Sequence, residues 1–207
     1  MSGFAIDDVR VRLCRVPVDP PRGDAIQQFD ALELPIVDIV DGAGRHGLGF
    51  GYTIGTGGTA IVALLRDQLV EQLRGKDSRA IASLVNRLRK SIHALTPGCV
   101  SSTALAAIDV ALWDLAAKRA QTPLHLLLGG AQDRVRLYNT HVGWLNRPLD
   151  EMVALSREAV ERDRFTALKL KVGKPDPAED VERVARVREA VGDRVTLMVD
   201  ANQSWTI

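Results

Sequence analysis

Strand-like and helix-like segments alternate regularly through the last third of the chain. The predicted strands span residues 135–141, 166–172 and 195–201, and the predicted helices between them span residues 149–162 and 177–191. Such alternation is typical of parallel strands joined by right-handed crossover helices. We therefore expect a parallel β/α layer in this part of the chain.

The residues before this layer follow a different pattern. Alternating apolar residues predict strands at residues 6–16, 34–40 and 48–52, which would form an antiparallel meander. Several prolines and a glycine predict an irregular loop at residues 17–24. The glycine-rich residues 54–58 match neither the P-loop nor the dinucleotide fingerprint, so they are interpreted as an ordinary loop.

Three helices are expected to follow these strands. Helical spacing places them at about residues 59–73, 79–93 and 102–119, with Thr59 as the N-cap of the first. The third is rich in alanine, which permits close helix contacts. Because the pattern changes after Gly129-Gly130, we predict an α+β domain at residues 1–130 and a β/α domain at residues 131–207.

Two lysines occupy alternate positions in one predicted strand of the β/α domain. Side chains alternate between the two faces of a strand, so Lys169 and Lys171 point the same way. Asp200 and Asn202 stand at the end of the next strand. Functional side chains gather at the carboxyl ends of parallel strands, and an apolar layer does not hold three charges without a use for them. These positions therefore predict a functional site.

The residue types at this site indicate carbon-acid chemistry. A partly desolvated lysine beside another ammonium group is a usable base near neutral pH. Removing a proton next to a carboxylate creates an enediolate that needs a divalent cation, and Asp200 is a suitable oxygen ligand for Mg²⁺. A single carboxylate does not complete a metal site. His141, at the end of the first predicted β/α strand, is a candidate substrate-facing residue, whereas the other three histidines are interpreted as structural or surface residues.

Composition excludes several other classes of function. The formal net charge is +1 with both signs interspersed, which argues against a nucleic acid or membrane-surface partner. The two cysteines are too few for a disulfide framework, which fits a reducing compartment. Neither a signal peptide pattern nor an apolar run of about 18 residues is evident. A cytoplasmic protein that binds a small molecule is expected.

Three longer motifs resemble the mandelate racemase and muconate lactonizing branch of the enolase superfamily. They are Ala-Leu-Ala-Ala-Ile-Asp-Val-Ala-Leu-Trp-Asp-Leu at residues 104–115 with Leu-Leu-Gly-Gly at 127–130, Lys-Leu-Lys-Val-Gly at 169–173, and Val-Asp-Ala-Asn-Gln-Ser-Trp at 199–205. The resemblance implies an α+β capping domain followed by an incomplete (β/α) TIM-type barrel, since only three strands of about eight are present.

The same resemblance implies roles for individual residues. Lys171 would be the proton-abstracting base, Lys169 would tune it, Asp200 would be the first magnesium ligand, and Asn202 would lie near the substrate. Residues 17–24 and 51–57, with Arg22 and Tyr52 as substrate-binding residues, would form the specificity lid.

The implied activity is that of an acid-sugar dehydratase that uses Mg²⁺ and takes a proton from the carbon next to a carboxylate. A racemase or epimerase of the same family is the first alternative, and a catalytically inactive fragment or interaction module is the second. The resemblance also implies a homo-oligomer for a full-length parent. The 207-residue chain alone is expected to be inactive.

Overall fold

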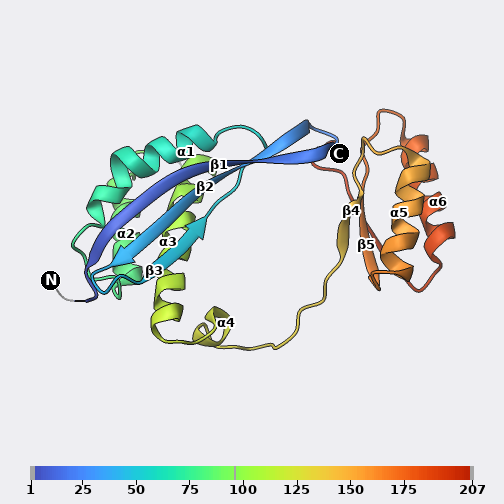
Figure 1. Ribbon diagram of the computed structural model, residues 1–207. Helices are drawn as coiled ribbons and strands as arrows, with labels where there is room; N and C mark the ends of the chain where they lie inside the picture. Colours follow the sequence, from blue (N-terminus) through green and yellow to red (C-terminus); the bar gives the residue numbers. More distant parts are fainter. Residues whose placement is uncertain (1–2, 96, 206–207) are drawn as a thin grey trace. The chain divides into compact units, whose positions relative to one another are not determined.

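The computed structural model describes residues 3–95 and 97–205, which form two compact units (Figure 1). The first unit comprises Met1–Pro17 and Ala31–Asp133, and the second comprises Val18–Asp30 and Arg134–Ile207. Residues 18–30, which lie within the predicted first domain, group with the second unit in the structure.

The first unit is built on a three-stranded sheet. Its strands are β1 (Ile6–Gly23), β2 (Gln28–Asp41) and β3 (His46–Phe50), in the order β1-β2-β3, and β2 and β3 are antiparallel. The last residues of β1, from 18 on, and the first of β2, up to 30, group with the second unit. The loop predicted at residues 17–24 is wrong, because β1 continues to Gly23. Its prolines are tolerated because β1 lies at the edge of the sheet. The turn follows at Asp24, whose carboxylate accepts the backbone N–H groups of Ile26 and Gln27.

Helices complete the first unit. They are α1 (Gly58–Leu64), which continues as the π-helical η1 (Leu65–Leu69) and the 3-10 helix η2 (Val70–Gln72), then α2 (Ile81–Ser91), α3 (Cys99–Arg119) and α4 (Leu124–Leu127). The prediction that Thr59 caps the first helix is wrong. The helix begins one residue earlier, and the carboxylate of Glu33 accepts the N–H of Gly58 at 2.8 Å instead.

Helix α3 is the core helix of the first unit. Its apolar face packs on β3, and six of its side chains are completely buried: Ala104, Ala107, Ile108, Ala111, Leu112 and Leu115. By length and composition alone this helix could cross a membrane, which the sequence analysis did not anticipate. Because α3 packs against the sheet, its apolar composition is that expected of a core helix.

The second unit contains the predicted parallel β/α layer. Its elements are β4 (Asn139–Gly143), α5 (Leu149–Glu161), β5 (Ala167–Lys171), α6 (Pro177–Val191) and β6 (Thr196–Asp200). The strand order is β4-β5-β6, and both pairings are parallel. The first strand begins at Asn139 rather than residue 135, because its pairing with β5 starts at Asn139 and Leu168.

The two long helices of the second unit cover one face of its sheet (Figure 1). Leu168 and Leu170 of β5 point toward them and are at most 1% exposed, together with Met152 of α5 and Val187 of α6. The predicted fold class is therefore confirmed: an α+β unit precedes parallel β/α structure of the kind that builds a TIM-type barrel.

Candidate active site

The face of β5 that points away from the helices holds the two lysines. Lys169 and Lys171 alternate with the buried Leu168 and Leu170, as the sequence predicts. The parallel register sets Lys171 directly beside Asp200 of β6. One register position thus brings a cation and an anion together at the carboxyl ends of two neighbouring strands.

The two ammonium groups share one carboxylate oxygen. Oδ2 of Asp200 accepts hydrogen bonds from Nζ of Lys169 at 3.0 Å and from Nζ of Lys171 at 2.8 Å. Nζ of Lys171 also donates to Oδ1 of Asn202 at 2.6 Å. The side chains of Lys171 and Lys169 are 11% and 23% exposed. The predicted cluster of Lys169, Lys171, Asp200 and Asn202 therefore exists as a single hydrogen-bonded network.

These contacts keep Asp200 ionised. The Lys171 ammonium group, then the backbone N–H of Asn202 and the Lys169 ammonium group, lower the pKa of Asp200 well below its usual range. The N–H of Asn202 donates to Oδ1 of Asp200 at 3.0 Å, and Asn202 itself has a positive φ of 45°. Asparagine adopts this left-handed conformation more readily than most residues.

Trp144 is a site residue that the sequence analysis missed. It follows β4, and its ring centroid lies 5.7 Å from Nζ of Lys171 and 5.5 Å from Cζ of Arg22. Phe29 meets the same ring edge-on at 5.6 Å. The signal that could have found Trp144 is its place immediately after a parallel strand, where site residues gather.

Residues 18–30, called the arm below, bring Arg22 to this site. The side chain of Asn146 holds the arm from two sides, since its Oδ1 accepts the N–H of Gly23 at 2.8 Å and its Nδ2 donates to the carbonyl of Pro21 at 2.9 Å. The N–H of Leu145 also donates to the carbonyl of Gly23 at 2.8 Å. Arg22 lies between these anchored residues, so its position is fixed by the loop after β4.

Removing the Asn146 side chain should loosen the arm. In Asn146→Ala, the amide of Gly23 loses its acceptor, and its hydrogen exchange should become about fivefold faster because one such bond contributes about 1 kcal/mol. Exchange followed by mass spectrometry on the peptide that covers residues 18–30 measures this. Asn146→Asp is the matched variant, since it keeps the acceptor for Gly23 but loses the donor to Pro21, so its protection should lie between those of wild type and Asn146→Ala. Equal exchange in wild type and Asn146→Ala would refute the anchoring role.

The substrate-binding roles predicted for His141 and Tyr52 both stay predictions. His141 ends near the arm, where partial desolvation, then the positive charges of Arg147 and Arg22, lower the pKa of its imidazole. It is therefore mainly neutral at pH 7. Tyr52 belongs to the first unit and is 64% exposed, so its substrate-binding role stays a prediction.

Helix α6 positions both loops of the site through two buried charged residues that sequence reasoning missed. Oδ2 of Asp180 accepts the N–H groups of Gly173 and Lys174 at 2.7 and 3.0 Å, which fixes the loop after β5. The guanidinium of Arg183 donates to the carbonyls of Trp144 and Arg147, both at 3.1 Å, which fixes the loop after β4.

The residues present supply only part of a magnesium site. Within residues 3–95 and 97–205, no group of three His, Cys, Asp or Glu side chains is placed to hold a metal ion. Asp200 offers one hard oxygen ligand, and its Oδ2 is already bonded to two lysines. The donor type thus fits Mg²⁺, but the described residues do not complete its coordination.

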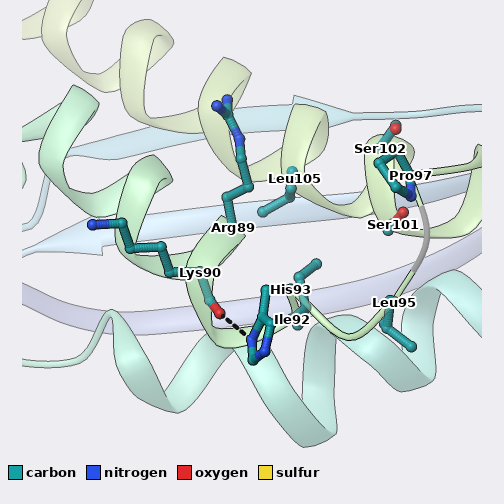
Figure 2. A pocket seen from close by; sticks show the side chains of 9 residues that line it. All are labelled: Arg89, Lys90, Ile92, His93, Leu95, Pro97, Ser101, Ser102 and Leu105. Carbon is teal, nitrogen blue, oxygen red and sulfur yellow. Dashed lines mark hydrogen bonds between the residues drawn. The ribbon is translucent and has the colours of Figure 1, made fainter.

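A separate hollow in the first unit does not match the predicted chemistry. It has a volume of about 410 Å³ and lies between the end of α2 and the start of α3 (Figure 2). Ile92, Leu95 and Leu105 give it an apolar wall, and Nδ1 of His93 donates to the carbonyl of Lys90 at 3.0 Å. The described residues that line it include no carboxylate, so it does not offer the oxygen ligand that the chemistry needs.

Together, an α+β unit and a β/α unit with two lysines beside an aspartate define an enolase-type arrangement. Comparison with known proteins identifies the family. Residues 7–129 match the model of the mandelate racemase / muconate lactonizing enzyme N-terminal domain, and residues 151–207 match that of the enolase C-terminal domain-like family. The chain belongs to the mandelate racemase / muconate lactonizing enzyme family, which confirms the resemblance seen in its sequence.

Individual relatives are similar over nearly the whole chain. L-talarate/galactarate dehydratase of Salmonella typhimurium is 38% identical, with 99% of this chain and 52% of the relative covered. 3,6-Anhydro-alpha-L-galactonate cycloisomerase of Streptomyces coelicolor is 36% identical, with coverage of 98% and 56%. The solved Salmonella dehydratase liganded with Mg and L-lyxarohydroxamate has a TM-score of 0.93, 36% identity, and coverage of 99% and 54%. The chain spans about half the length of the curated relatives it matches.

Proposed function

We propose that this chain contributes the base and one metal ligand to the active site of a magnesium-dependent acid-sugar dehydratase. The observation that supports this most directly is the network of Lys169, Lys171 and Asp200 at the carboxyl ends of β5 and β6. The similarity to L-talarate/galactarate dehydratase supports the choice of an acid sugar. The arm adds a guanidinium, that of Arg22, which suits a carboxylate ligand.

Distinct tasks are proposed for the two lysines. Lys171 is the more buried and reaches both Asp200 and Asn202, so it would be the base that takes the proton from the carbon next to the substrate carboxylate. Lys169, which also donates to Asp200, would offset negative charge on the substrate carboxylate. Asp200 would supply one oxygen ligand to Mg²⁺, which when bound supplies electrostatic stabilisation of the developing enediolate.

A racemase or epimerase is the second candidate. L-Ala-D/L-Glu epimerase of Clostridium acetobutylicum is 31% identical, and a solved structure described as a racemase from Streptomyces coelicolor with bound magnesium is 36% identical. Both reactions begin with the same proton abstraction. Dehydration then needs an acid that protonates the departing β-hydroxyl, whereas racemisation needs an acid on the opposite face of the carbon. We further propose a cytoplasmic location and, for a full-length protein, a homo-oligomer.

The deciding experiment follows the α-proton. Reading the encoding DNA past Ile207 establishes which protein to express, and that protein is incubated in D₂O with Mg²⁺ and a panel of aldonic and aldaric acids. Deuterium at the α-carbon with a 2-keto-3-deoxy product would establish a dehydratase, and deuterium with inverted configuration would establish a racemase or epimerase. Absence of exchange across the panel, in a protein that binds Mg²⁺, would refute both.

The 207-residue chain by itself should bind Mg²⁺ weakly. With Asp200 as one ligand that already accepts two ammonium groups, we expect a dissociation constant above about 1 mM and no turnover. Isothermal calorimetry and the exchange assay measure these two quantities. Tighter magnesium binding together with α-proton exchange would show that these residues suffice, and would overturn this expectation.

A further inference from the structure

We propose that Trp144 is a positioning residue whose single indole ring fixes both the Lys171 ammonium group and the arm, an inference that rests on the proposed role of Lys171 as the base. The two cations come from segments far apart in the sequence. Arg22 lies in the arm, Lys171 ends β5, and both lie within 6 Å of the Trp144 centroid. At this separation the electron-rich face of an indole attracts cations.

Contacts on both the backbone and the ring hold Trp144 in place. The backbone carbonyl of Trp144 accepts a hydrogen bond from the buried guanidinium of Arg183 at 3.1 Å. Phe29 of the arm packs edge-on against the indole ring, with an interplanar angle of 82°. The indole Nε1 is buried and has no hydrogen-bond partner among the described residues. The ring, rather than its N–H group, therefore makes the contacts seen here.

The arrangement places Lys171 between two neighbouring strands. Asp200 and Asn202 bind its ammonium group from the β6 side, and Trp144, which follows β4, lies near it from the other side. Arg22 uses the same ring. Displacement of the arm would change the surroundings of Trp144, and hence the position of Lys171, without any contact between Arg22 and Lys171 being required.

NMR of lysine side chains tests this directly, without turnover. The chain has six lysines, so ¹³C-lysine labelling gives six Cε–Hε signals that can be assigned by Lys→Arg substitution. An aromatic ring shifts the signals of nearby protons. We expect the Lys171 signal to be displaced from those of Lys76, Lys90 and Lys118, the displacement to be smaller in Trp144→Phe, and the displacement to be lost in Trp144→Leu.

The coupling between arm and base has its own variant. Arg22→Ala should move the Lys171 signal although Arg22 is not its hydrogen-bond partner, whereas Trp205→Phe, a matched change at an exposed ring of the same unit, should leave it in place. An unchanged Lys171 signal in Trp144→Phe or in Arg22→Ala would overturn the proposal, and these two variants decide it even where Trp144→Leu fails to fold. Shifts as expected in a protein that exchanges no α-proton would leave Trp144 as a positioning residue and refute the proposed function instead.

Discussion

Replacing Gly49 by alanine should destabilise the first unit by about 3 kcal/mol or more, the upper range for overpacking a core. Strand β3 approaches helix α3 so closely that a Cβ at Gly49 would lie 2.0 Å from the carbonyl oxygen of Ala107 and 2.5 Å from the N of Ala111. Both atoms belong to the helix backbone, so no side-chain rotation relieves the clash. The helix and the sheet would have to separate along their most buried contact.

Urea unfolding, followed through the fluorescence of Trp113 on α3 with Trp144 and Trp205 both replaced by Phe, measures this loss. Two other glycine-to-alanine changes separate packing from backbone effects. Gly44→Ala meets no atom within 4 Å but has a φ of 75°, so it should cost about 1 kcal/mol. Gly3→Ala makes only an ordinary 3.6 Å contact and should be nearly neutral. If Gly49→Ala behaved like Gly3→Ala, the close packing of β3 on α3 would be wrong.

Local pattern was sufficient to predict most of the second unit. The helix predicted at residues 177–191 is α6 as observed, and the parity of Lys169, Lys171 and Asp200 follows from the two-residue period of a strand. The side chains that form the charged network could therefore be named before any coordinates, because each lies on a regular strand or at its end.

The missed features depend on partners that are distant in sequence. Glu33 replaces Thr59 as the group that binds the first N–H of α1, across 25 residues. Asn146 binds Gly23 across 123 residues, and this contact helps to place the arm in the second unit. Trp144 matters only once the arm and β5 lie on either side of it. No local periodicity reports such pairings, so the prolines and glycine of residues 17–24 predict an irregular loop when taken alone.

The largest effect on activity is expected from Lys171→Ala in the protein that exchanges α-protons. Removing a general base costs about 10²–10⁴-fold in rate, so exchange should fall to the lower limit of detection. The loss should not come from unfolding. Lys169 still donates to Oδ2 of Asp200 in this variant, which leaves the carboxylate paired, and the lost hydrogen bonds to Asp200 and Asn202 should cost about 1–2 kcal/mol together.

Lys174→Ala provides the matched control three residues further along the chain. Its ammonium group lies 3.7 Å from the carboxylate of Glu179 on α6, and its ion-pair partner is therefore Glu179 and not Asp200. Removing it should change exchange little. Deuterium incorporation at the α-carbon and thermal unfolding should be measured on wild type and both variants. A folded Lys171→Ala variant with wild-type exchange would remove Lys171 as the base. A specific role for Lys171 predicts a large loss of exchange in Lys171→Ala and little loss in Lys174→Ala. Equal losses in the two variants would show instead that exchange depends on the loop after β5 as a whole.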